Sequence, residues 1–299
     1  MRPEIIDVHV HTSDREMLGL HTKDASLQAI EEAADQFGIE KLFVLATYFP
    51  FKGRGLHNLP LLGRLQGRSR FAAIGSLDVM NAFEQGVDEL AHLCEHGRLA
   101  GIKLYPGYQR FHVGDAHLDR VYELAAHHHL PVTIHGGELH HCCSAKRRQV
   151  GDLACKAPSC WIDQLGMLAH PDAFARAAES FPEVTFVIAH LANPYFGQLR
   201  ELMRRFPNVV TDISGQFVSA THEDTPEYRA YIVHQIQLFL DEVPNGEDRL
   251  LFGSDFPIQS FADSIDLIEK LNVSDDVKAK IFRHNALRVY SRAFEGGVG

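Results

Sequence analysis

The stretch EIIDVHVH, residues 4–11, decides how this sequence folds and what it can bind. Its isoleucines and valines form the short apolar run that is typical of a strand buried on both faces. His9 and His11 lie two residues apart, so their side chains point to the same face of that strand. Two imidazoles side by side at a strand end can chelate a divalent cation. The stretch therefore predicts a strand that ends at a metal site.

Seven similar runs follow between amphipathic stretches, which gives eight predicted strands: Glu4–His11, Lys41–Tyr48, Arg70–Leu77, Ala100–Tyr105, Pro131–His135, Val184–His190, Asn208–Ser214 and Arg249–Asp255. The predicted helices between and after them are Ser26–Gly38, Asn81–Gly97, His117–His129, Pro171–Phe181, Phe196–Phe206, Pro226–Val243, Phe261–Leu271 and Ser274–Ser291. Eight strands that alternate with helices predict the α/β class and a (β/α)₈ TIM barrel.

The whole chain, residues 1–299, is expected to form a single domain, because no linker rich in Pro, Gly or Ser interrupts the alternation. The connection after the fifth predicted strand, residues 136–170, is much longer than an ordinary barrel loop. We expect this insertion to pack as a lid, with a short helix over residues 161–169.

Composition excludes several classes of protein. The net charge of -10 argues against nucleic acid and against a polybasic membrane anchor, since both need a basic surface. No apolar run approaches the roughly 20 residues of a membrane helix. A cleaved signal peptide would remove His9 and His11. We therefore expect a cytoplasmic protein that acts on a small-molecule substrate, and a homo-oligomer is compatible with the sequence.

Four more polar residues lie near the ends of other predicted strands: Lys103, His135, His190 and Asp255. The carboxyl ends of all strands meet at one face of a parallel barrel, so these side chains should converge with His9 and His11. Imidazoles with a carboxylate suit Zn²⁺, and also Mn²⁺, Fe²⁺ or Co²⁺. Asp255 can ligate and accept a proton, and His190 can polarise a substrate oxygen or relay a proton. Any one of them alone would more often be structural, and the prediction depends on the set.

The motifs DVHVH (7–11), IKLYP (102–106), TIH (133–135), VIAH (187–190) and FGSDFP (252–257) resemble the amidohydrolase superfamily. The closest similarity is to its amidohydrolase-related branch, which includes aminocarboxymuconate-semialdehyde decarboxylase and TIM-barrel hydrolases. The resemblance implies that His9, His11, His135 and Asp255 bind a catalytic metal. It implies for His190 either an acid/base role beside one metal or ligation of a second metal.

Lys103 has two interpretations. The resemblance allows a carboxylated lysine that bridges two metals, whereas an unmodified Lys103 would hold a substrate carboxylate as an ammonium. We expect one metal ion and a cationic Lys103, with two ions as the alternative. Tyr105, Gln109 and Arg147 are candidate substrate-binding residues, although a solvated surface cation is the more usual role for an arginine like Arg147.

The predicted lid also contains Cys142, Cys143, Cys155 and Cys160. Thiolates can hold a structural zinc, but the spacing is not that of repeated CxxC pairs, and free cysteines packed in the lid are the alternative. The run His127–His129 closes a predicted helix, where cations suit the helix dipole, and is read as structural.

These features predict a metal-dependent hydrolase that activates water to attack an ester-, lactone- or amide-like bond. The alternative is a non-oxidative decarboxylase, or a hydratase, which uses the same site on a small carboxylic acid. A non-catalytic metal-binding barrel is a third hypothesis. It is disfavoured because no candidate ligand is lost and because acid/base groups accompany the ligands.

Overall fold

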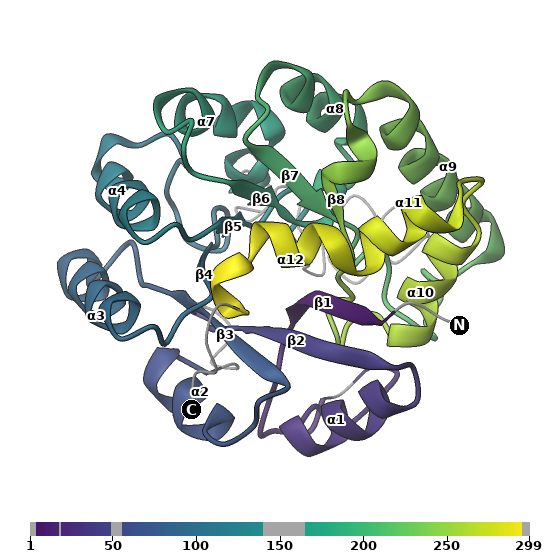
Figure 1. Ribbon diagram of the computed structural model, residues 1–299, viewed down its shortest axis with the longest axis horizontal. Coiled ribbons are helices and arrows are strands. Elements are labelled where there is room, and N and C mark those ends of the chain that lie inside the picture. Colours follow the sequence, from purple (N-terminus) through teal and green to yellow (C-terminus); the bar gives the residue numbers. More distant parts are fainter. Residues whose placement is uncertain (1–3, 18, 49–55, 140–164, 295–299) are drawn as a thin grey trace, which may run out of the picture.

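The structure is a computed structural model that describes residues 4–17, 19–48, 56–139 and 165–294. Eight parallel strands form one sheet in sequential order from β1 to β8 (Figure 1). Their bounds are β1 Ile5–Val10, β2 Ile39–Leu45, β3 Phe71–Ser76, β4 Gly101–Leu104, β5 Val132–Ile134, β6 Phe186–Ile188, β7 Val209–Asp212 and β8 Leu250–Leu251. Each strand overlaps one of the predicted runs, so the prediction of the eight strands is confirmed.

The segment that follows β8 closes the sheet against β1. The backbone N–H of Val8 donates to the carbonyl of Phe252 at 3.1 Å, and Asp255 N–H donates to His9 at 2.7 Å. His11 N–H then donates to Phe256 at 2.8 Å. Because β1 and the end of β8 are bonded to each other, the sheet forms the predicted TIM barrel.

Helices surround this barrel on the outside (Figure 1). The described helices are α1 Leu27–Asp35, α2 Asn58–Leu65, α3 Phe83–Glu95, α4 Asp119–His127, α7 Ala175–Ser180, α8 Phe196–Arg205, α9 Pro226–Glu242, α10 Phe261–Glu269, α11 Asp275–Ala279 and α12 Asn285–Val289. Ser26 caps α1 by accepting from Ala29 N–H, and Ser274 caps α11 in the same way. The sequence pattern did not indicate α2, and it predicted one continuous helix where α11 and α12 are separated by a π-helical turn, Lys280–His284.

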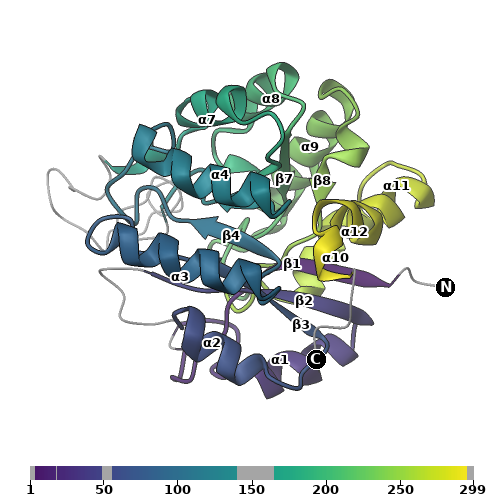
Figure 2. The same cartoon turned by 60° about the vertical axis from the view of Figure 1, so that its left-hand side comes forward.

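Two apolar cores lie on the two sides of the sheet. The larger one fills the space between the strands and the outer helices. The smaller one lies inside the barrel, where Ile6, Phe43 and Val210 pack with Val289 and Tyr290 from the end of the chain. Figure 2 shows α12 at the end of the barrel where β1 begins. The closing helix therefore plugs the amino-terminal end of the barrel and leaves polar side chains to the other end.

The described ends of the predicted lid lie next to each other. Gly137 N–H donates to the carbonyl of Ala169 at 2.8 Å, and Gly166–Ala169 forms a short 3₁₀ helix. Gly137 has a φ of 91° and would place a Cβ 2.3 Å from the carbonyl oxygen of Asn193, so only glycine fits there. Most of the lid, with residues 140–164, lies outside the described residues. None of the described helices combines the length and the apolar character that a bilayer-spanning helix requires.

Candidate metal centre

His9, His11 and Asp255 form a compact group of possible metal ligands at the carboxyl end of the barrel. Asp255 Oδ1 lies 3.4 Å from His11 Nε2 and 3.8 Å from His9 Nε2. The His9 and His11 rings are 5.5 Å apart, as expected for side chains on one face of β1. His9 is buried, whereas the His11 and Asp255 side chains are 23% and 14% exposed. The group therefore has one deep member and two members that a small molecule can reach.

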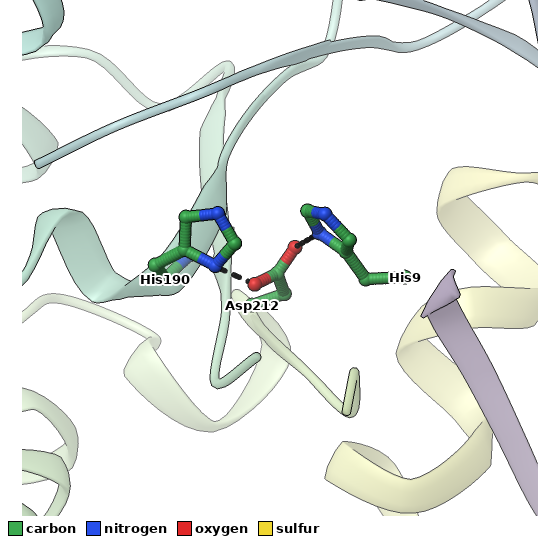
Figure 3. Close-up of side chains that lie close together, drawn as sticks. All are labelled: His9, His190 and Asp212. Carbon is green, nitrogen blue, oxygen red and sulfur yellow. Dashed lines mark hydrogen bonds and ion pairs between the residues drawn. The ribbon is translucent and has the colours of Figure 1, made fainter. Parts of the chain in front are cut away.

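Asp212, at the end of β7, holds two of the site histidines (Figure 3). Its Oδ2 lies 3.0 Å from His9 Nδ1, and its Oδ1 accepts from the backbone N–H of His190 at 2.9 Å. A carboxylate beside Nδ1 places the imidazole proton on that nitrogen, so the lone pair of His9 lies on Nε2. Nε2 is the atom that faces His11 and Asp255, and His9 is thus prepared to ligate a cation.

Ser214 connects the same network to the ring of His190. Its Oγ lies 2.8 Å from His190 Nδ1 and 3.1 Å from His9 Nδ1, and it also donates to Asp212. The carbonyl of Ser214 lies 3.1 Å from His190 Nδ1. A proton on Nδ1 satisfies this carbonyl, which leaves the lone pair of His190 on Nε2. Both buried histidines therefore present Nε2 for chemistry.

Asp7 ties β1 to the loop that carries Asp255. Its Oδ1 accepts from the backbone N–H of His9 at 3.0 Å and from Ser254 N–H at 3.1 Å. Burial raises the pKa of Asp7 to about 7. The side chain thus acts as an internal brace that fixes the approach of His9 to Asp255.

Two of the site residues have a strained backbone conformation. His190 has a φ of 64° and Asp255 a φ of 61°, in the left-handed region that non-glycine residues seldom occupy. Between them lies Gly215, where a Cβ would stand 2.7 Å from Asp255 Oδ2 and 3.1 Å from His190 Nδ1. The close approach of Asp255 and His190 to β7 therefore depends on the absence of a side chain at residue 215.

Lys103 is fully buried in β4, and the carboxylates of Asp212 and Asp255 act on the charge of its ammonium. Its Nζ has no hydrogen-bond partner among the described residues and lies 5.2 Å from the ring centre of Tyr105. Burial lowers the pKa of Lys103 to about 8, while Asp212 and Asp255 oppose that shift. At neutral pH the site thus contains a buried cation with unused donors, which is costly unless an anion completes it.

The buried imidazoles are held in the neutral form. Burial and, to a lesser degree, the cation of Lys103 and the neighbouring histidines hold the pKa of His9 well below its ordinary value. Burial and the neighbouring His9 and His135 do the same for His190. A neutral imidazole with its second nitrogen hydrogen-bonded is the form that ligates metal ions. The donor set of His9, His11 and Asp255 therefore fits a divalent transition metal.

His135, which follows β5, lies beside His190. Its ring centre is 4.9 Å from that of His190 and 4.8 Å from that of Tyr108. His135 Nε2 lies 3.3 Å from the carbonyl oxygen of Glu138. Two compact groups of possible ligands lie at the barrel mouth among the described residues: His9, His11 and Asp255, and His9, His190 and Asp212. His135 belongs to neither. Its role as a ligand stays a prediction.

The three candidate substrate-binding residues have different surroundings. Tyr105 is buried and donates its hydroxyl to the carbonyl of Ala46 at 2.7 Å. The amide of Gln109 bonds to the backbone of Val79, Leu77 and Tyr48, so it braces the loops after β2 and β3. Arg147 and the four lid cysteines lie outside the described residues. A role in binding substrate stays a prediction for all three residues.

Asp212, Ser214 and Asp7 are the residues that the sequence analysis missed. Asp212 ends β7 and lies near the end of the seventh predicted strand, so the rule that selected Lys103 and Asp255 could also have selected it. Asp7 stands inside the quoted stretch DVHVH and gave no separate signal. Ser214 ended the same predicted strand but gave no signal of its own, because serine is common where a strand passes into a turn.

The chain matches the family model described as amidohydrolase over residues 6–292. No curated protein sequence matches it. Solved structures with a similar fold include an amidohydrolase from Burkholderia multivorans with bound zinc, at 16% identity and a TM-score of 0.68. That comparison covers 96% of this chain and 99% of the other.

Two further similar structures are named as enzymes of different reaction types. A probable 2-pyrone-4,6-dicarboxylic acid hydrolase from Acinetobacter baumannii, with citric acid bound, is 13% identical at a TM-score of 0.65, covering 96% of this chain and 99% of that one. A 5-carboxyvanillate decarboxylase from Novosphingobium aromaticivorans, complexed with manganese and 4-hydroxy-3-methoxy-5-nitrobenzoic acid, is 16% identical at a TM-score of 0.57. It covers 88% of this chain and 79% of its own. At these identities the comparison establishes the fold and leaves the reaction open.

Proposed function

Because the chain belongs to the amidohydrolase family, we propose that it is a metal-dependent hydrolase that cleaves an ester-, lactone- or amide-like bond in a small carboxylic acid. One observation supports this proposal above the others. The metal-type group of His9, His11 and Asp255 is accompanied by the buried ammonium of Lys103, whose donors are unused by the described residues. The first set suits a cation that activates water, and the second suits a substrate carboxylate.

We assign His9, His11 and Asp255 as metal ligands and propose His135 as the fourth. One ion with a cationic Lys103 is the arrangement we favour, with zinc, manganese, iron or cobalt as candidates. Such a cation supplies Lewis acidity, which lowers the pKa of water and polarises a carbonyl oxygen. Asp212 and Ser214 do not need to touch the cation, because they hold the rings of His9 and His190 in place.

The protein side chains then divide the proton transfers. We propose that Asp255 accepts the proton of the attacking water, since its carboxylate lies beside both histidines of β1. His190 carries its lone pair on Nε2, so we propose that it first takes over the proton from Asp255. As an imidazolium it then stabilises the oxygen that gains charge and returns the proton to the leaving group. Lys103 orients the substrate by pairing with its carboxylate, which gives the buried ammonium the anion that it lacks.

Non-oxidative decarboxylation is the alternative, and one similar structure is named for that reaction. It requires the carboxylate that departs to lose its charge in an environment that does not stabilise it. An ammonium paired with that group would stabilise the ground state and slow the loss of CO₂. If Lys103 pairs with the carboxylate that would depart as CO₂, it therefore disfavours decarboxylation. If it pairs with another carboxylate of the substrate, it does not distinguish the two reactions.

The test is a panel of substrates presented to protein reconstituted with zinc or manganese. The panel contains lactones that carry a carboxylate, 2-pyrone-4,6-dicarboxylate among them, together with 2,6-dihydroxybenzoate and 5-carboxyvanillate. Proton release measures hydrolysis, and a coupled assay measures CO₂. Proton release without CO₂, lost after chelation and restored by metal, is the expected result.

Two results would count against the proposal. Release of CO₂ from the benzoates with no hydrolysis of any lactone would assign the decarboxylase reaction. A purified protein that retains no Zn, Mn, Fe or Co, and gains no activity from any of them, would overturn the metal-dependent enzyme itself. Asp255→Asn serves as the matched inactive control, because it preserves the shape of the side chain and removes the proton acceptor.

A further inference from the structure

A second group of metal-type side chains lies outside the barrel, at the carboxyl-terminal end of α3 (Figure 1). His92, Glu95 and His96 are all exposed there. Among the described residues this is the one such group that lies away from the barrel mouth. It shares no residue with the proposed active site, so its chemistry has to be explained separately.

The helix places the three side chains on one face. Residues at positions i, i+3 and i+4 are neighbours on a helix surface, and the possible ligand atoms of His92, Glu95 and His96 all lie within 4.8 Å of one another. The two imidazole rings are 4.3 Å apart between their centres. Two ligands with bonds of about 2.0–2.2 Å to one cation lie at most about 4.4 Å apart, so these exposed side chains would have to rotate slightly inward to bind it together.

The tautomer of His96 is already set for ligation. His96 Nδ1 lies 2.8 Å from the backbone carbonyl oxygen of His92, so this nitrogen donates a proton to the carbonyl. The lone pair of His96 is consequently on Nε2. Metal-binding histidines are usually oriented in this way by a carbonyl or carboxylate on the second nitrogen. This hydrogen bond is a second observation, independent of the sequence spacing, that favours His96 as a metal ligand.

Two electrostatic features also favour a cation at this place. The carboxyl-terminal end of a helix carries partial negative charge from its last carbonyl groups. Glu95 adds a full negative charge and forms no ion pair with any lysine or arginine of the described residues. The site thus offers two imidazole nitrogens and one carboxylate at the carboxyl-terminal end of a helix.

We propose that His92, Glu95 and His96 bind a divalent transition metal of the zinc type at the surface of α3. Two imidazoles and one carboxylate match the preference of zinc and of its neighbours in the transition series, and exclude magnesium, which prefers oxygen ligands. Three protein ligands leave a coordination position to solvent. The bound ion joins the last turn of α3 from His92 to His96 and stabilises that end of the helix.

The experiment measures zinc bound per chain by equilibrium dialysis and elemental analysis, over a range of free zinc concentrations. The wild-type protein is compared with His92→Gln/His96→Gln, and the matched control is His234→Gln/His284→Gln, which changes two other exposed histidines. The double variant in α3 should bind one equivalent fewer than the wild type, and the control should bind the same number. Because the comparison is a difference, ions at the barrel mouth or elsewhere cancel.

Zinc should also raise the thermal unfolding midpoint of the wild type more than that of the α3 variant, and magnesium should raise neither. Glu95→Gln should keep the site but weaken it at least tenfold. Equal zinc binding by the wild type and the α3 variant would overturn the proposal. Unchanged affinity in Glu95→Gln would overturn the three-ligand site. Hydrolytic activity should be the same in all these variants, so this test is independent of the proposed function.

Discussion

The two ends of the barrel interior differ sharply although the same strands build both. Toward the amino-terminal end, Ile6, Phe43 and Val210 pack with Tyr290 in an apolar plug. Two residues after Val210 on β7 stands Asp212, which binds two histidines at the other end. The left-handed φ angles of His190 and Asp255 lie at that polar end as well. We infer that the apolar end contributes most of the folding stability, which offsets the cost of the strained backbone and buried charges at the polar end.

The first way to test this division is to remove the proposed base at the mouth. Asp255→Asn should lower kcat on the order of 10³-fold, because a positioned base contributes roughly 10²–10⁴-fold. Its free energy of unfolding should change little, since the side chain is partly exposed and isosteric. Steady-state kinetics and urea unfolding on the same preparation measure both quantities. If Asp255→Asn instead lowered the free energy of unfolding and left kcat unchanged, Asp255 would serve stability and not catalysis.

The converse change is in the plug. Phe43 is fully buried in the inner core and packs 4.6 Å from the ring of Tyr290. Phe43→Ala should lower the free energy of unfolding by about 3–5 kcal/mol, the cost of deleting a buried aromatic side chain. The folded fraction should keep wild-type metal binding and KM. Loss of metal affinity in protein that remains folded would show that the two ends are coupled rather than separate.

Removing the charge of Lys103 should raise the free energy of unfolding, whereas truncating Phe43 should lower it. Burial lowers the pKa of Lys103 from 10.5 to about 8, so the folded state binds its proton less tightly than the unfolded state does. Stability of the metal-free protein should rise with pH between 8 and 10.5 and be lowest below pH 8. Below pH 8 the buried, protonated Lys103 lowers the free energy of unfolding by about 3 kcal/mol, because a pKa difference of one corresponds to about 1.36 kcal/mol.

Lys103→Met removes that cost, so the metal-free variant should be more stable than the wild type at pH 7 by up to about 3 kcal/mol. It should also lose the rise in stability above pH 8. Affinity for carboxylate substrates should fall, and denaturant titrations at pH 7 and pH 10 check the stability. A variant less stable than the wild type would mean that Lys103 is paired in the folded protein.

The smallest of these effects is expected at Asp212. Asp212→Asn keeps the size of the side chain but removes the charge beside His9 Nδ1. Loss of such a partner typically weakens metal binding by about 10–100-fold. Competition with a chelating dye measures the change, and Asp241→Asn is a control, because Asp241 is an exposed carboxylate on α9. Identical metal affinities for Asp212→Asn and wild type would remove Asp212 from the proposed function.

The sequence predicted the strands better than the details that make the site work. All eight strands were found because buried parallel strands are short apolar runs with punctuation on both sides. The helix α2 was missed because Pro60 and Gly63 suggest a loop. Pro60 is tolerated because it lies in the first turn, where its missing N–H has no helical partner to lose.

The sequence predicted only those residues of the candidate site that lie at the carboxyl ends of predicted strands. His9, His11 and Asp255 come together in the structure, and Lys103 lies beside them. The left-handed conformations of His190 and Asp255 were not predictable, since neither is a glycine, and tertiary contacts impose them. Nor does a sequence indicate that the amide of Gln109 bonds to three backbone groups from neighbouring loops.

The plug of Val289 and Tyr290 has a consequence for biosynthesis. Ile6 and Val8 pack inside the barrel with Val289 and Tyr290, which are synthesised much later. His9 likewise meets Asp255 only after most of the chain has been synthesised. Contacts this distant in sequence form late and slowly. The apolar side chains of β1 therefore stay exposed in a nascent chain until α12 has been synthesised. During that interval the chain is most prone to aggregation and depends most on chaperones.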